Sequence, residues 1–179
     1  MSRIDQFYDR NTRRPPERRA AVFSFSAFHR VHSWACFGMA TLDPDDLDEI
    51  LSAELGAREL GAAAWTALRA SRYLEDGVEV RRVWEALKTD PSKRIFEEMK
   101  KRAGVRSIKA LFRGSASVDL IWTEGTIELQ PHRHIRGDRW ALFKNRVTIK
   151  FSETVSEEEL GTALLSELEV SRNGSYEGI

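Results

Sequence analysis

The chain has 179 residues, of which 41% are hydrophobic and 31% are charged, and its 28 basic residues balance its 28 acidic ones. This composition is typical of one globular domain with a real core. It excludes a membrane span, because no apolar run approaches the ~20 residues that a spanning helix needs. The absence of an apolar stretch after the first basic residues argues against a signal peptide, and a single cysteine, Cys36, excludes internal disulfides and predicts a cytoplasmic protein.

Charged residues are unevenly distributed along the chain. Residues 1–30 carry seven Arg against three acids, and residues 81–113 carry eleven Lys or Arg against four acids. Residues 43–59 hold seven acids and one Arg, and residues 153–169 hold six Glu and no base. Such segregation can create faces of opposite sign. The alternative, which we favour for the chain as a whole, is that helices place charge on their solvated sides.

The first twenty residues predict a flexible basic arm, and residues 21–179 predict a single globular domain. Adjacent prolines, Pro15 and Pro16, oppose regular structure, and little in this segment could be buried. An arginine arm can contact nucleic-acid phosphates, although a solvated tail is the simpler interpretation. The arginines concerned are Arg13, Arg14, Arg18 and Arg19.

Residues 21–41 predict one or two strands, because they are rich in aromatic and β-branched side chains and Phe23 and Phe25 alternate with small polar residues. The segment that follows predicts a short helix. Asp43 suits the N-cap, Pro44 suits the first helical position, and the next acids suit the positive end of the helix dipole.

A phrase recurs in the chain, first as ELGAAAWTALRASR at residues 59–72 and then as ELGTALLSELEVSR at residues 159–172. Seven of the fourteen positions are identical. Apolar residues at helical spacing predict a helix for each copy, and a glycine near each start would let the backbone lie close to a sheet. Ser156 and Glu159 match the pattern of a capping box, and the Ser-Arg at the end of each copy is predicted to close its helix.

Two more helices are predicted between the copies, one over residues 80–87 and one around residues 95–99, with Gly104 as the stop. From residue 105 onward the apolar period changes to two. Residues 118–129 predict a β-hairpin that turns at Glu124-Gly125. The remaining predicted features are the end of a strand at Pro131, a loop at 134–143 anchored by Trp140, and a strand at 147–151.

This order of elements predicts an α/β (α+β) fold, in which helices pack on a mostly antiparallel sheet. Each copy of the phrase follows strand-like sequence. We therefore predict two similar strand–helix halves around a central helical insertion.

No nucleotide-binding, hydrolase or metalloprotease motif is present, which argues against the common classes of enzyme. Histidines fall into two pairs, His29 with His32 near Cys36, and His132 with His134. They could hold zinc only if the two segments met in space, and we favour hydrogen-bonded or exposed histidines without a metal. Cys36 has no catalytic context and is predicted to be buried and inert. We predict no catalytic residue, no cofactor and no metal.

The motifs, in their order and duplication, resemble those of a known family. The repeated E-L-G-x-A phrase with its terminal Ser-Arg, the segment GTIELQP at residues 125–131 and the downstream Trp140 are similar to the CdiI family of contact-dependent growth inhibition (CDI) immunity proteins. Glu167 departs from the family pattern, which prefers alanine there. The resemblance implies a small cytoplasmic protein that blocks a toxin domain delivered by a neighbouring cell, and such toxins are commonly nucleases, including EndoU-type RNases. Shared motifs mark the scaffold, so no functional residue is carried over from the family.

Our first hypothesis is therefore a non-enzymatic immunity protein that covers the active site of a nuclease-like CdiA C-terminal toxin domain. Nuclease active sites are basic, so an acidic surface is their natural complement and steers association. The predicted contacts are Asp45, Asp46, Asp48, Glu157 and Glu158, with Trp140 as an aromatic anchor.

The alternative hypothesis is a nucleic-acid-binding module that uses the basic arm and residues 81–113. We favour it less. Steep salt dependence of binding would distinguish it from the first hypothesis. Neither hypothesis involves a membrane.

Overall fold

The computed structural model describes residues 15–43, 45, 47–89, 91–144 and 146–174. Within this part of the chain there are ten strands and five helices. The strands are β1 (Glu17–Ser24), β2 (Phe28–Ser33), β3 (Ala35–Cys36), β4 (Ala40–Thr41), β5 (Asp48–Ser52), β6 (Arg72–Tyr73), β7 (Ala116–Thr123), β8 (Thr126–Arg136), β9 (Arg139–Leu142) and β10 (Ile149–Ser152). The helices are α2 (Ala57–Ala70), α3 (Gly77–Leu87), α4 (Pro91–Ala103), α5 (Ile108–Leu111) and α6 (Glu157–Asn173).

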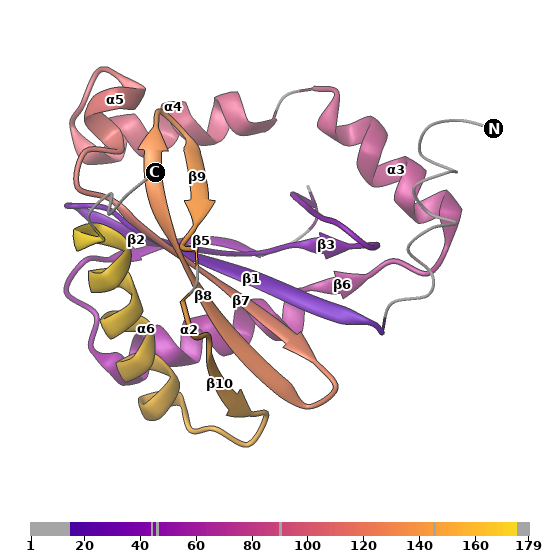
Figure 1. Cartoon of the computed structure of the whole chain (residues 1–179). Helices are drawn as coiled ribbons and strands as arrows, with labels where there is room; N and C mark the ends of the chain where they lie inside the picture. Colours follow the sequence, from indigo (N-terminus) through magenta and orange to yellow (C-terminus); the bar gives the residue numbers. More distant parts are fainter. Residues whose placement is uncertain (1–14, 44, 46, 90, 145, 175–179) are drawn as a thin grey trace.

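Seven strands form one curled antiparallel sheet, a half-barrel, in the order β10-β8-β7-β1-β2-β5, with β9 paired to β8 beside this path (Figure 1). The central strands β1 and β7 pair over their full length, with Val22 opposite Val118. Each also forms a hairpin, β1 with β2 and β7 with β8. A small second sheet, β4-β3-β6, includes the parallel pair β3–β6.

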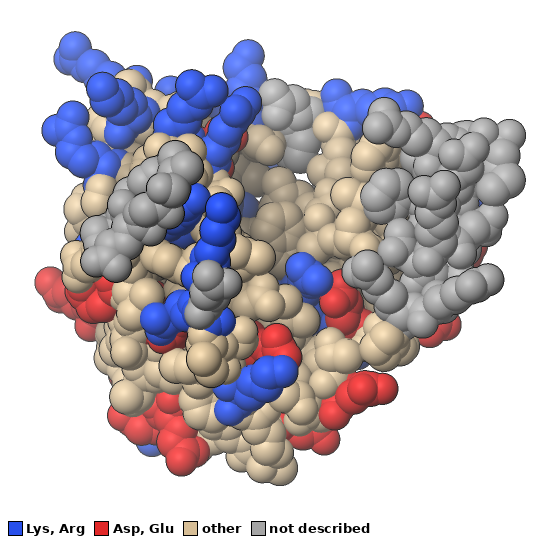
Figure 2. Space-filling view, in the orientation of Figure 1, with Lys and Arg blue, Asp and Glu red and all other residues tan. Residues whose placement is uncertain are grey.

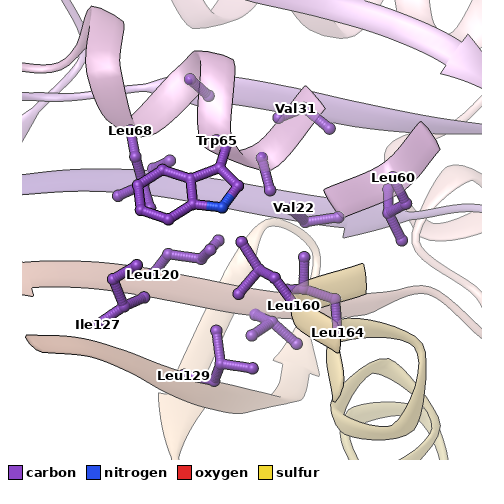
Figure 3. Close-up of a cluster of buried hydrophobic side chains, with 14 of the residues drawn as sticks. Val22, Val31, Leu60, Trp65, Leu68, Leu120, Ile127, Leu129, Leu160 and Leu164 are labelled. Atoms are coloured by element: carbon purple, nitrogen blue, oxygen red, sulfur yellow. The ribbon is translucent and has the colours of Figure 1, made fainter. Parts of the chain in front are cut away.

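Helices pack against both faces of the large sheet, because successive side chains of a strand point to opposite faces. Val22 belongs to the main core beneath α2 and α6, whereas its neighbour Phe23 joins an aromatic cluster beneath α4 and α5. Figure 3 shows the main core, in which leucines of the two helices meet aliphatic side chains of the strands. A third cluster joins α3 to the small sheet. The predicted α+β fold, with helices on a mostly antiparallel sheet, is confirmed.

The helices α2 and α6, which contain the repeated phrase, pack directly on each other. A Cβ atom on Gly61 would lie 1.8 Å from the carbonyl oxygen of Glu157, and one on Gly161 would lie 1.7 Å from that of Ala57. Only a residue without a side chain permits this approach. The repeated glycine therefore serves a contact between helices, and not the contact with a sheet that the sequence predicted.

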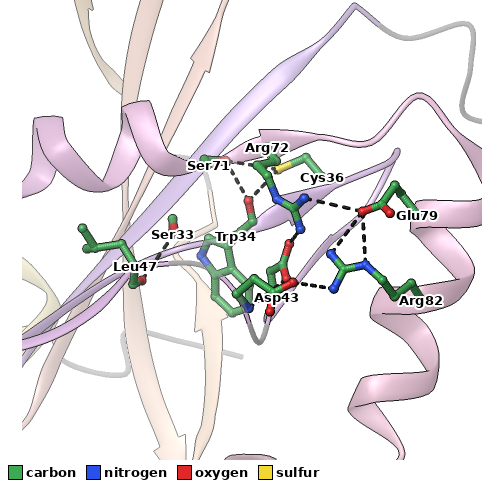
Figure 4. Close-up of polar contacts among 10 residues, drawn as sticks. Ser33, Trp34, Cys36, Asp43, Leu47, Ser71, Arg72, Glu79 and Arg82 are labelled. Carbon is green, nitrogen blue, oxygen red and sulfur yellow. Dashed lines mark hydrogen bonds and ion pairs between the residues drawn. The ribbon is translucent and has the colours of Figure 1, made fainter.

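The repeated serine joins each helix end to a hairpin. Ser71 Oγ accepts a hydrogen bond from the backbone N of Arg19 (2.8 Å) and donates one to the backbone O of Trp34 (2.7 Å), at the end of the β1–β2 ladder (Figure 4). Ser171 Oγ inserts in the same way into the β7–β8 ladder, where it accepts from a backbone N and donates to the backbone O opposite. These partners are Ser117 and His132. Each hydroxyl thus replaces a ladder hydrogen bond and fixes the helix to the sheet.

Two predictions for the first half of the chain need correction. The strand β1 begins at Glu17, so residues 17–20 belong to the sheet and not to an arm. The predicted short helix after Asp43 is replaced, in the described residues, by a turn at Asp45 and the strand β5. Asp43 still accepts a hydrogen bond from the backbone N of Asp45 (3.1 Å), so its capping chemistry shapes a turn here.

Pro131 does not end its strand, and the predicted loop at 134–143 is a hairpin. On the edge of β8 opposite β7, β10 pairs only up to Leu129 and β9 pairs only from His132 onward. Pro131 lies between these two partners, where its missing N–H breaks no hydrogen bond of the sheet. The chain then turns at Gly137, whose φ of 56° favours glycine, and returns as β9.

The description of two similar halves remains a prediction. Among the described residues, three helices, α3, α4 and α5, do lie between α2 and β7 in the chain. None of the helices in the described part of the chain has the length and apolar character that crossing a bilayer requires.

Candidate functional site

The acidic residues predicted to contact a partner lie on different elements. Glu157 and Glu158 occupy the first turn of α6, whereas Asp48 begins β5 and Asp45 stands just before it. Asp46 lies outside the described residues. The described carboxylates among the five therefore come from two separate parts of the fold, one at the start of β5 and one at the start of α6.

The N-terminal ends of α2 and α6 together form an exposed acidic surface, which we name the acidic end. The glycine crossing brings the two ends into contact, and Figure 2 shows acidic side chains gathered there at the lower left. Arg58 is the basic residue beside it, with its Nε 4.0 Å from the carboxylate of Glu157 and 77% of its side chain exposed. The acidic end comprises Glu54, Glu59, Glu157, Glu158 and Glu159, all of them exposed.

The capping box keeps this surface charged and fixes its geometry. Ser156 Oγ accepts a hydrogen bond from the backbone N of Glu159, and the carboxylate of Glu159 accepts one from the backbone N of Ser156 (both 3.2 Å). Hydrogen bonds from the side chain and then the backbone of Ser156 lower the pKa of Glu159. The helix start is therefore a rigid, anionic surface, as the capping pattern in the sequence predicted.

Asp45 and Asp48 are compensated by arginines of the same chain. The guanidinium of Arg30 holds Asp48 through two hydrogen bonds of 2.7 and 3.0 Å. Arg82 on α3 pairs with Asp45 and also with Glu79, at 3.1 Å. The hydrogen bonds that Arg82 donates to Glu79 and to Asp45 raise its pKa. These two aspartates therefore contribute little net negative field compared with the acidic end.

Trp140 is half-buried in the aromatic cluster beneath α4 and α5. Its ring lies edge-on to Phe23, with 5.8 Å between centroids, and 5.0 Å from the ring of His134. Part of its surface therefore already packs within the chain. The structure does not place Trp140 in contact with the acidic end.

The histidine pairs do not assemble a metal site. His29 and His32 lie three residues apart in β2, so their side chains point to opposite faces. Burial, and then the positive charge of Arg30, lower the pKa of His32 to about 3, so it is neutral at physiological pH. No group of three or more His, Cys, Asp or Glu side chains that could hold a metal occurs within the described residues.

Cys36 is buried, as predicted, beside the hydroxyl of Ser71. Burial raises the pKa of its thiol to about 12. A thiol that stays protonated is a poor nucleophile and a poor metal ligand. Cys36 therefore packs in the interior, where its protonated thiol is unfavourable for nucleophilic attack or metal binding.

The helices α4 and α5 present the opposite charge. Figure 2 shows a group of Lys and Arg side chains at the upper left, over these two helices. Two acids, Glu97 and Glu98, lie in the same segment of residues 91–113. We name this surface the basic face. Its bases are Lys93, Arg94, Lys100, Lys101, Arg102, Arg106, Lys109 and Arg113.

Sequence reasoning missed Glu54 and Glu59 as members of the acidic end. Both lie in the acidic segment 43–59, but nothing local indicates that the start of α2 meets the start of α6. The glycine repeated at the same position in both helices was the available signal, because paired glycines are typical of close helix crossings.

Comparisons with known proteins agree with this architecture. The family model described as CdiI, CDI immunity protein, matches residues 18–171. The structure of a protein of unknown function, NMB0488 from Neisseria meningitidis, is similar with a TM-score of 0.71 and 21% sequence identity, covering 89% of this chain and 98% of that one. The CdiA-CT/CdiI toxin and immunity complex from Yersinia pseudotuberculosis is similar with a TM-score of 0.66 and 22% identity, covering 84% of this chain and 97% of that one. No curated protein sequence gives a significant match.

Proposed function

Because the chain belongs to the CdiI family of CDI immunity proteins, we propose that it binds and neutralises a cognate CdiA-CT toxin domain in the cytoplasm of the cell that makes it. As a member of this family it is a toxin inhibitor and not an enzyme. The Yersinia structure of the same fold contains a CdiA-CT toxin together with its immunity protein, which supports a stable complex as the mode of action.

We further propose that the toxin is a nuclease and that the acidic end covers its active site. The observation that carries this proposal is the concentration of exposed carboxylates where α2 and α6 meet. A nuclease holds phosphates in a basic site, so such a surface is complementary to it and accelerates association. Glu157 and Glu158 are the primary contacts.

We propose a smaller contribution to toxin binding from the other predicted contacts, which are Asp45, Asp46, Asp48 and Trp140. The arginine partners of Asp45 and Asp48 must be displaced or shared before either carboxylate can meet a basic partner. Trp140 can contribute only the part of its ring that the aromatic cluster leaves exposed.

The test is charge reversal at the acidic end, with the CdiA-CT domain encoded beside this chain as the partner. We expect E157K/E158K to slow association by roughly tenfold or more at low salt and to weaken protection of growing cells. The variant E97K/E98K is the matched control, because it makes the same change in net charge on α4 and should leave association nearly unchanged. Equal rates for E157K/E158K and wild type would show that the acidic end is not the contact.

The nuclease assignment needs its own measurement. We expect the purified toxin domain to cleave RNA or DNA, and stoichiometric immunity protein to stop cleavage. A partner that forms the complex but cleaves neither nucleic acid would leave the inhibitor function intact and refute the nuclease part of the proposal.

Nucleic-acid binding is the second candidate, and the basic face is the observation in its favour. Two arginines of the predicted arm are already engaged, since Arg18 donates to the backbone O of Arg69 (3.0 Å) and Arg19 donates to Glu17 (3.1 Å). Arg13 and Arg14 lie outside the described residues. Tight RNA or DNA binding by the isolated protein, with a steep loss of affinity as salt rises, would favour this candidate.

A further inference from the structure

The helix α3 is attached to the rest of the protein by a small apolar contact. It buries two residues, Val80 and Val83, whereas α2 and α6 each bury six. The two valines and the half-buried Trp84 pack on the small sheet, in a cluster separate from the main core. A helix with so little buried apolar surface detaches at a lower free energy than the one that unfolds the whole protein.

Five side chains of alternating charge also join α3 to β6 and to the segment between β4 and β5. Arg72 of β6 pairs with Asp43 and, at 3.6 Å, with Glu79 of α3 (Figure 4). Arg82 of α3 pairs with the same Glu79 at 3.1 Å and with Asp45. This series of ion pairs, which we name the ion chain, therefore begins and ends in one segment and holds α3 between its two ends.

Most of the ion chain is accessible to solvent and salt. The side chain of Asp43 is fully buried. The other four side chains, which are 37–57% exposed, are those of Arg72, Glu79, Arg82 and Asp45. Salt weakens exposed ion pairs, because the Debye length falls from about 10 Å at 0.1 M to about 3 Å at 1 M ionic strength. The buried pair therefore anchors the ion chain, and the exposed pairs break first.

We propose that the ion chain is a latch, which holds α3 closed on the small sheet and opens when a competing cation takes Asp45. While Arg82 pairs with Asp45, the carboxylate is partly neutralised, so a cation binds it more tightly once α3 has moved away. Linkage is reciprocal, and a basic partner at Asp45 therefore favours the open state by the same factor. Asp45 is one of the proposed toxin contacts, so this coupling rests on the proposed function, whereas the latch itself does not.

Native-state hydrogen exchange of the free, full chain, followed by NMR, tests the latch without the toxin. The variant D45N changes no residue of α3, and we expect it to speed exchange of the α3 amides roughly threefold to fivefold. R82A removes two ion pairs and should speed this exchange roughly tenfold, although alanine is the better helix former. Amides of α6 in the main core should exchange at the wild-type rate in both variants.

The matched control is E85Q. It removes the ion pair of Glu85 with Lys88 (2.6 Å), which lies along α3 and does not join this helix to another element. We expect it to change exchange of the α3 amides less than twofold. Salt gives a second test, since about 1 M NaCl compared with about 0.1 M should speed exchange of α3 several-fold in the wild type and less in R82A, where exposed pairs are already lost.

Two results would overturn the latch. One is equal exchange of α3 in D45N and in the wild type. The other is exchange of α3 no faster than that of the core amides of α6, which would mean that α3 opens only when the whole protein unfolds.

The complex with the CdiA-CT domain tests the coupling. Faster exchange of α3 in the complex than in the free chain would support it, and unchanged or slower exchange would refute it. If the toxin domain does not bind, the proposed function fails and the coupling fails with it, whereas the measurements on the free chain still decide the latch.

Discussion

The helices α2 and α6 contain the same phrase but are stabilised differently at their ends and in their middles. What they share touches other parts of the fold, the glycines at the crossing and the serines in the hairpin ladders. Their N-terminal ends differ in a local way. The N-cap of α2 is Gly56 without a side-chain cap, and α6 has a capping box. Their middles differ through Glu167, which pairs with Arg146 outside the helix. The glycines and serines repeated in both helices therefore mark tertiary contacts, whereas the caps differ because each depends on its own helix alone.

The crossing is the strongest test of this comparison. We expect G61A and G161A each to destabilise the protein by about 3 kcal/mol or more, or to prevent folding, because the new methyl group would overlap backbone atoms of the other helix. Urea unfolding measures the effect. G77A is the matched control, since a Cβ at Gly77 meets nothing within 4 Å. A mild effect at Gly61 would mean that the helices can separate without cost.

Glu167 breaks the similarity in the middle of the helices, where α2 has Ala67. Its carboxylate is 2% exposed, is held by Arg146 Nη2 at 2.6 Å, and leaves Oε2 unpaired. We expect R146A to cost about 3 kcal/mol, because it leaves a buried carboxylate without its partner. We expect E167A to cost less than about 1 kcal/mol, because Arg146 is 34% exposed and can be solvated. Chemical unfolding of both variants measures this asymmetry, and a larger loss for E167A would contradict it.

The serines should behave alike in the two helices. We expect S71A and S171A each to cost about 1–3 kcal/mol, because each leaves a backbone N–H and a C=O of a hairpin without a partner. S166A, on the exposed side of α6, is the control and should be nearly neutral. Thermal denaturation compares the three, and a difference of more than about 1 kcal/mol between S71A and S171A would show that the two anchors are not equivalent.

Changes at the two N-caps should have the smallest effects on stability. The cap can be removed from α6 and introduced into α2. S156A should destabilise by about 1 kcal/mol, through loss of the hydrogen bond to the backbone N of Glu159. G56S should stabilise by a few tenths of a kcal/mol, since serine at Gly56 and the existing Glu59 complete the same pattern in α2. The Glu59 carboxylate must move slightly, because its Oε2 would lie 2.7 Å from the new Cβ. Helicity and unfolding free energy measure both, and a loss of stability in G56S would show that Glu59 cannot adjust.

Elements that depend on neighbouring residues could be predicted from the sequence. Apolar spacing predicts the helices α2, α3, α4 and α6, and the capping pattern of Ser156 and Glu159 locates the start of α6 within a residue. The β7–β8 hairpin turns at Glu124-Gly125, as predicted. The prediction for Pro131 was wrong, because only the pairing of β8 with two different outer strands leaves a place for it.

The candidate site was predictable only in part, because some of its features depend on contacts between residues that are far apart in the chain. The residues Glu157 and Glu158 are acidic and exposed in any helix start, so the sequence alone identified them. The arginine partners of Asp45 and Asp48 come from α3 and β2, and the acidic end exists only because two glycines let α2 and α6 meet. Periodicity and capping, which act over a few residues, are determined by the sequence by itself. Charge pairing, helix crossing and cavities join residues far apart in the chain, and only the tertiary structure decides them.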